Sequence, residues 1–241
     1  MYRNILLKEV KNLNRKLRIL FACSIVVLQL CIASVALACS VSYTASVSPA
    51  LMTDWIQALN INKFDPASFP GAVLQSIDID LTGQMTGEMR LENMSPSPST
   101  VTMQLSSTLE LKAPDNSILL TATPQVLKVE AVAGKDNAFD WAGPAGRTYL
   151  DLSASKFESV SLTAPASLAL FTGAGTIACP VAATGNSVAL GSGNLITWFT
   201  TFAAADVKVT YNYTLVPEPG SVLALGTGLI GLMGLALRRR Q

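Results

Sequence analysis

Ile77-Asp78-Ile79-Asp80-Leu81-Thr82 decides the fold class of this chain, because apolar and polar side chains alternate along it. Successive side chains of a β-strand point to opposite faces of the sheet, so a period of two indicates a strand with one buried and one solvated face. The carboxylates of Asp78 and Asp80 belong to the solvated face.

The same alternation recurs on the C-terminal side of this stretch. Gly83 and Gly87 predict a turn or bulge, and turn residues at 93–99, 114–116 and 134–137 separate the later segments. Further strands are predicted at residues 101–111, 118–123, 126–132, 157–162, 168–172, 176–181, 194–203 and 207–213. Only residues 49–59 have helical spacing, although Trp55-Ile56-Gln57 also suits a strand. We therefore expect an all-β fold, a single sandwich of eight to ten strands of jelly-roll or Greek-key type.

The N-terminal residues 1–38 have the pattern of a secretory signal peptide. A basic region is followed by an apolar run at residues 19–38, which ends in an A-x-A cleavage pattern at Ala36 and Ala38. Two alternatives stay open, an uncleaved membrane anchor and lipidation at Cys39. Lipoprotein signals prefer a larger aliphatic residue where this chain has Ala36.

The C-terminal residues 216–241 carry three features in a fixed order. Pro217-Glu218-Pro219 comes first, an uncharged apolar run follows, and Arg238, Arg239 and Arg240 close the segment. A helix over residues 221–237 would be about 25 Å long, a little under the ~30 Å hydrocarbon core of a bilayer. We therefore predict a short transmembrane helix with its arginines in the cytoplasm.

This order of parts resembles the PEP-CTERM sorting signal of Gram-negative bacteria. The resemblance implies recognition by an exosortase, a membrane-embedded cysteine protease-transpeptidase that cuts near Pro217-Glu218-Pro219 and releases or transfers the upstream domain. Such proteins are typical of species that make exopolysaccharide and biofilm. An ordinary C-terminal anchor would explain the apolar run and the arginines, but it leaves the Pro-Glu-Pro triplet unexplained.

The exported part, residues 39–215, resembles the choice-of-anchor E domain from about residue 45 onward. The resemblance rests on residues 53–57 (Thr-Asp-Trp-Ile-Gln), residues 62–66 (Asn-Lys-Phe-Asp-Pro), the strand through Ile77 and Ile79, and Glu92-Asn93 before residues 100–102. Residues 67–71 depart from the family pattern. The family pairs a β domain with alternative C-terminal anchors, and the resemblance implies no enzymatic activity.

The charge of the exported part excludes a nucleic-acid partner. Residues 39–215 contain 14 acidic and 8 basic residues, so the formal charge of +1 of the whole chain comes from its two ends. A mildly acidic domain has no basic field for phosphates. Whether Cys39 and Cys179 form a disulfide is left open by the sequence.

The chain contains no histidine, which removes Ser-His-Asp and Cys-His catalysis and the commonest zinc ligand. We therefore predict no catalytic residues, no metal and no cofactor. Asp78 and Asp80 could lie ~7 Å apart, the separation that a weak carboxylate-dependent hydrolase would need, although the solvated face of a strand explains them better. The Ser153–Lys156 spacing suits a solvated strand better than a catalytic pair. Asp136, Asn137 and Asp140 offer oxygen ligands for a calcium ion, but their spacing matches no calcium loop and lacks the later acidic ligand, so turn chemistry explains them better.

The three tryptophans offer a different chemistry, since an aromatic ring can stack on a sugar. Trp141 lies among loop residues and is the best candidate, whereas Trp198 is expected in the core. The sequence thus predicts a non-enzymatic exported protein of the cell surface or extracellular matrix, held transiently in the inner membrane. The alternatives are a carbohydrate (exopolysaccharide)-binding module and a weak hydrolase.

Overall fold

The computed structural model describes residues 37–215 and 227–228. The predicted cleavage residue Ala36, the triplet Pro217-Glu218-Pro219, the arginines at 238–240 and nearly all of the predicted transmembrane helix lie outside these residues. Within the described ranges, no helix has the length and apolar character needed to cross a membrane. Ala38, the second predicted cleavage residue, lies in the first strand.

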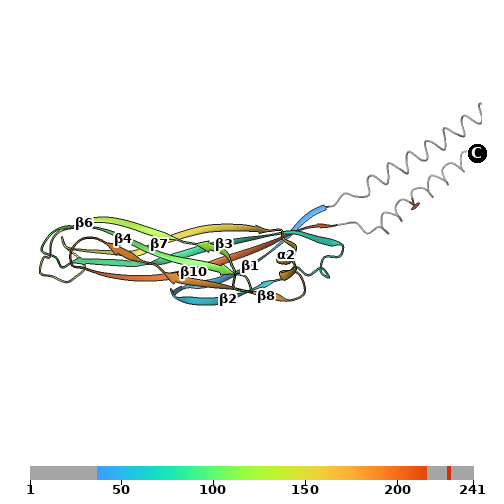
Figure 1. The fold of residues 1–241 in the computed structure, drawn as a ribbon, viewed down its shortest axis with the longest axis horizontal. Helices are drawn as coiled ribbons and strands as arrows, with labels where there is room; N and C mark the ends of the chain where they lie inside the picture. The colour runs from blue at the N-terminus through green and yellow to red at the C-terminus, as the bar shows by residue number, and fades with distance from the viewer. Residues whose placement is uncertain (1–36, 216–226, 229–241) are drawn as a thin grey trace, which may run out of the picture. The chain divides into compact units, whose positions relative to one another are not determined.

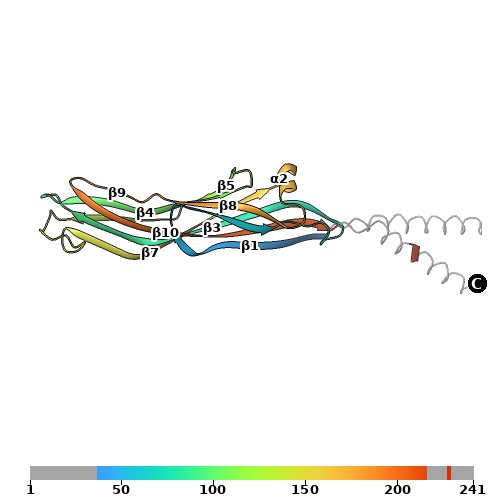
Figure 2. The same cartoon turned by 90° about the horizontal axis from the view of Figure 1, so that it is seen from below.

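Ten strands are present in the described part, and they form two antiparallel sheets (Figures 1 and 2). The four-stranded sheet has the order β1-β10-β3-β7 and contains β1 (Leu37–Met52), β3 (Ala72–Asn93), β7 (Gly146–Leu162) and β10 (Leu195–Leu215). The six-stranded sheet contains β2 (Trp55–Asn62), β4 (Ser99–Lys112), β5 (Ile118–Ala122), β6 (Gln125–Val132), β8 (Thr176–Gly185) and β9 (Val188–Leu190). Its order is β2-β8-β4-β5, and β6 and β9 also pair with β4. The all-β prediction is confirmed.

The chain divides into two compact units. The larger one comprises residues 40–65 and 74–212 and contains most of both sheets. The other includes residues 66–73 and 213–215, where Gly71 has a positive φ of 75° and the rings of Phe69 and Tyr213 lie 5.2 Å apart. The Ala72 N–H donates to the carbonyl of Phe69 and so closes this turn.

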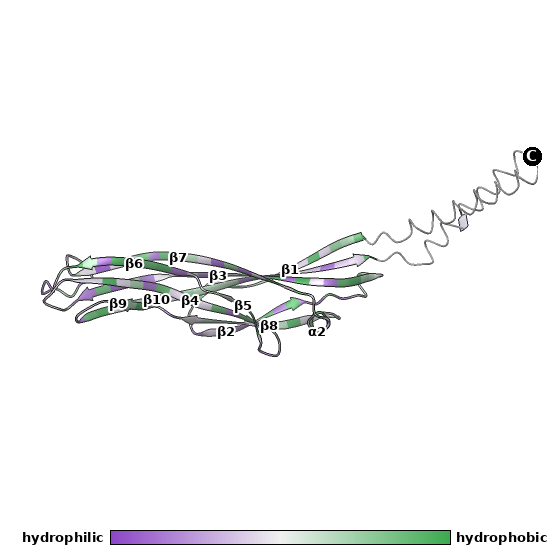
Figure 3. Ribbon diagram, turned by 45° about the horizontal axis from the view of Figure 1, so that its top comes forward, coloured by the Kyte–Doolittle hydropathy of each residue, from purple (hydrophilic) through white to green (hydrophobic). Residues whose placement is uncertain are grey.

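The core of the larger unit lies between the two sheets. Ile77, Ile79 and Leu81 on β3 are buried, while Asp78 and Asp80 between them are not, as their alternation predicts. Figure 3 shows the same change between hydrophobic and hydrophilic residues along the strands. From β4, Met103 and Leu105 join Met85, Met89 and Leu91 of β3 in one cluster.

Several boundaries differ from the prediction. Residues 168–172 were expected to form a strand, but the segment contains the end of helix α2 (Pro165–Leu170). Pro165 begins this helix, where its fixed φ suits a first turn and its missing N–H costs nothing. Residues 49–59 do not form a helix and instead belong to the end of β1 and the start of β2. The strands predicted at 194–203 and 207–213 are one strand, β10.

Candidate functional site

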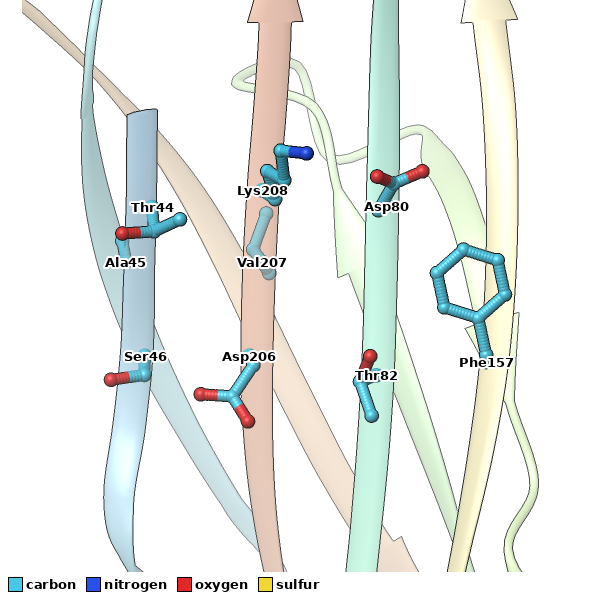
Figure 4. Close-up of a pocket in the computed structure, with 9 residues that line it drawn as sticks. All are labelled: Thr44, Ala45, Ser46, Asp80, Thr82, Phe157, Asp206, Val207 and Lys208. Atoms are coloured by element: carbon cyan, nitrogen blue, oxygen red, sulfur yellow. The ribbon is translucent and has the colours of Figure 1, made fainter. Parts of the chain in front are cut away.

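A pocket of about 460 Å³ lies on the outer face of the four-stranded sheet (Figure 4). All four strands contribute to it. Its lining combines the hydroxyls of Thr44, Ser46 and Thr82, the charged side chains of Asp80, Asp206 and Lys208, and the ring of Phe157.

The alternation of the strands places these side chains on one face. Asp206 and Lys208 point outward from β10 because Val207 and Val209 occupy the core between and beside them. Asp80 and Thr82 do the same on β3. Thr82 pairs with Phe157 across β3 and β7, and this register sets the aromatic ring beside the polar groups.

The polar groups of the pocket include both donors and acceptors. The Gln84 amide donates a 2.7 Å hydrogen bond from Nε2 to Oδ2 of Asp206, which holds that carboxylate from the neighbouring strand. Figure 4 shows the Lys208 side chain extending from β10 toward Asp80 on β3. The Phe157 side chain is 57% exposed, so one aromatic ring is open to a ligand.

Trp198 lies on the same face, farther along β10. It is 56% exposed, so the prediction that it packs in the core is wrong. Leu195 and Phe199 point inward and pack against the core cluster, which leaves Ile196 and Trp198 on the outer face. Its indole Nε1 donates to Oγ1 of Thr200 at 3.0 Å.

The indole is connected through Thr200 to a pair of charged residues on β3. The Thr200 hydroxyl donates to Oε1 of Glu88 at 3.5 Å, and the Glu88 carboxylate forms a 3.1 Å ion pair with the Arg90 guanidinium. An exposed ring with a carboxylate and a guanidinium beside it can contact both the apolar and the polar parts of a ligand.

Trp141 occupies a loop, as predicted, and its backbone is tightly held. Its φ is 59°, in the left-handed region. Its N–H donates to Oε2 of Glu92 at 2.9 Å, and its carbonyl accepts from Oγ1 of Thr148 at 2.9 Å. The Trp141 ring lies 4.9 Å from the ring of Phe139. A role in sugar stacking remains a prediction.

Glu92 is a buried carboxylate that sequence reasoning missed. Its side chain is 0% exposed and its Oε1 has no hydrogen-bond partner. Burial raises its pKa; the hydrogen bond from Trp141 lowers it, and the nearby carboxylates of Asp136 and Asp140 raise it further. The alternation through Leu91 gave no sign that Glu92 is buried, because it places residue 92 on the solvated face of the strand.

The remaining candidate residues have local partners. Asn212 donates from Nδ2 to Oδ2 of Asp78 at 2.7 Å. Asp136 and Asp140 accept hydrogen bonds from the N–H groups two residues on, which is the chemistry of a turn, and Asn137 has a positive φ of 69°. Within residues 37–215 and 227–228, no three His, Cys, Asp or Glu side chains gather in a way that could hold a metal ion.

The two cysteines and the Ser153–Lys156 segment were also considered in the sequence. Cys39 and Cys179 are free thiols. Lys156 forms a 3.3 Å ion pair with Glu158 on β7, where Ser153 and Ser155 are strand residues as predicted.

Comparisons with solved structures give distant likenesses to infectious bursal disease virus. Its VP2 subviral particle shares 15% identity over 83% of this chain and 50% of the viral one, with a TM-score of 0.16. The Gx strain structure shares 13% identity over 83% of this chain and 49% of the viral one, with a TM-score of 0.15. The chain thus spans about half the length of these proteins, and likenesses at such TM-scores carry no weight.

No curated protein matches the chain. The resemblance of the exported part to the choice-of-anchor E domain remains a prediction. A model of the PEP-CTERM protein-sorting motif matches residues 215–240, starting at the last residue of β10. The match confirms the sorting signal predicted at the C-terminal end and indicates an exported protein that is sorted by an exosortase.

Proposed function

We propose that this chain is a non-enzymatic exported protein whose C-terminal segment is cut beside Pro217-Glu218-Pro219 by an exosortase. The observation that carries the proposal is the position of the sorting motif. The match begins at Leu215, the residue at which β10 ends. A cut at the triplet would therefore remove the whole apolar tail and leave every strand of the sandwich intact.

Export and anchoring follow from the two ends of the chain. The predicted signal peptide, with Ala36 and Ala38 at its cleavage pattern, starts translocation. The apolar residues 221–237 then hold the protein in the inner membrane, because Arg238, Arg239 and Arg240 cannot cross it without a large cost. After processing, the domain reaches the cell surface or the extracellular matrix.

The non-enzymatic part of the proposal is supported by the composition and by one contact. A chain without histidine lacks the commonest general base near pH 7. The carboxylate of Asp78, half of the predicted hydrolase pair, accepts a hydrogen bond from Asn212, which suits a structural role.

The test is expression in a bacterium with and without its exosortase gene. With the enzyme present, we expect a shortened protein at the surface or in the medium; without it, the full chain should stay in the membrane fraction. Glu218→Ala should behave like the strain that lacks the enzyme, whereas Glu158→Ala, the same change at a partly exposed glutamate of β7, should be processed normally. Equal release of the Glu218→Ala and wild-type chains would refute the proposal.

A second candidate function is binding to exopolysaccharide. It is favoured by the two exposed aromatic side chains, Phe157 and Trp198, on the polar outer face of the four-stranded sheet. The test is co-sedimentation of the full chain with the polysaccharide of the producing cells. Failure to bind any of it would exclude this function.

A further inference from the structure

We propose that the outer face of the four-stranded sheet binds a neutral polysaccharide strand, whose sugar rings stack on Phe157 and Trp198. This inference rests on the second candidate function and gives it a site and a ligand chemistry. It also moves the site from the predicted Trp141 loop to the sheet.

The pocket around Phe157 has the chemistry of a sugar site. A pyranose ring carries hydroxyls, which both donate and accept hydrogen bonds, and it has an apolar C–H face. The carboxylates of Asp80 and Asp206 accept, the ammonium of Lys208 donates, and the Thr and Ser hydroxyls do both. The exposed Phe157 ring supplies the apolar surface.

The arrangement of charges favours a neutral ligand. The pocket contains the ammonium group of Lys208 and the carboxylates of Asp80 and Asp206. A charged ligand would therefore always lie near a group of its own sign. Near Trp198, the carboxylate of Glu88 is already paired with Arg90. A charged ligand would have to disrupt these contacts, whereas hydroxyl groups can add to them.

The distance along β10 from the pocket to Trp198 indicates a polymer and not a single sugar. Asp206, in the pocket, and Trp198 lie eight residues apart on β10 with their side chains on the same face, a span of about 27 Å along the strand. The Gln84 to Asp206 hydrogen bond connects β3 and β10 at the pocket end of this span. One extended ligand that reaches both rings would bind more tightly than two separate short ones.

The test uses the full chain in detergent and isothermal titration calorimetry. The probes are two neutral glucans, dextran and hydroxyethylcellulose, their short oligosaccharides, and the polyanionic alginate. We expect binding to at least one neutral glucan and weaker binding of the short oligosaccharides. Phe157→Ala and Trp198→Ala should each weaken binding to the polymer at least about tenfold.

Trp141→Ala and Phe139→Ala are the matched controls, because they remove exposed or half-buried rings from a loop outside the proposed face. They should leave the affinity unchanged, and unchanged thermal unfolding of the Phe157 and Trp198 variants would show that these remain folded. Loss of binding in Trp141→Ala alone would overturn the site while retaining the carbohydrate-binding function. Binding to alginate only would overturn the neutral ligand, and no binding to any glycan would overturn both the site and that function.

Discussion

Tyr211, on β10, donates a 2.8 Å hydrogen bond from its phenol to the backbone carbonyl of Asn62, at the end of β2. The two strands belong to different sheets, so this bond joins the layers of the sandwich. Tyr211 is fully buried, and burial raises its pKa, so the phenol keeps its proton and remains a donor. The ring of Phe64 lies 5.9 Å from that of Tyr211 and fills the adjoining core.

Tyr211→Phe should lower the free energy of unfolding by about 1 kcal/mol, because it removes one hydrogen bond and keeps the ring. Tyr211→Ala should cost about 3–5 kcal/mol, since it also leaves a cavity between the sheets. Urea unfolding of the full chain measures both values. Equal stability of Tyr211→Phe and wild type would mean that the bond to Asn62 contributes nothing.

Glu92→Gln should change how stability depends on pH. The raised pKa means that folded Glu92 binds its proton more tightly than the unfolded chain does. This contribution to stability is present below the unfolded pKa and is lost as the pH rises through the folded pKa. Glutamine cannot ionise, and its Oε1 can still accept the hydrogen bond from Trp141.

The melting temperature of Glu92→Gln, relative to wild type, is therefore expected to rise between pH 4 and pH 7. A difference of about 1 kcal/mol would appear as roughly 2–4 °C for a domain of this size. Glu158→Gln, at a partly exposed glutamate of β7, serves as the control and should show no such trend. A constant difference across this pH range would contradict the burial of an ionisable Glu92.

Gly87→Ala should destabilise the fold strongly. A Cβ atom at this position would collide with the backbone carbonyl of Thr200 on the neighbouring strand β10. Because backbone atoms cannot move aside cheaply, we expect a loss of about 3 kcal/mol or more. Thr86→Ala, one residue earlier and exposed, should stay close to wild type, and thermal unfolding compares the two. A fully stable Gly87→Ala chain would show that β3 and β10 are not packed this closely.

The Cys179 thiol should resist alkylation in the folded protein. Burial raises its pKa to about 11, so little thiolate exists at pH 8, and its side chain is buried in the core on β8. Iodoacetamide should modify Cys39, which is partly exposed, and should reach Cys179 only after unfolding. Peptide mass spectrometry distinguishes the two residues. Rapid modification of Cys179 in the native chain would contradict its position.

The buried residues of β3 and β4 could be predicted from the sequence, because only every second residue of these strands is apolar. It failed at Trp198 for a physical reason: Leu195-Ile196-Thr197-Trp198-Phe199 has apolar residues on both faces, so the pattern cannot say which face is buried. Helix α2 is too short to show helical periodicity. The pocket could not be predicted either, because its lining depends on the order in which four strands, distant in the sequence, lie side by side in the sheet. Asp80 was singled out, but its neighbours Asp206 and Phe157 were not.

The intact mass of the protein, recovered from the medium and from the membrane fraction of cells that carry the exosortase, tests the central claim most directly. If the chain is sorted as proposed, the mature form in the medium ends close to Pro217 and lacks the arginines at 238–240. A mature form that retains the whole tail to Gln241 would contradict the account.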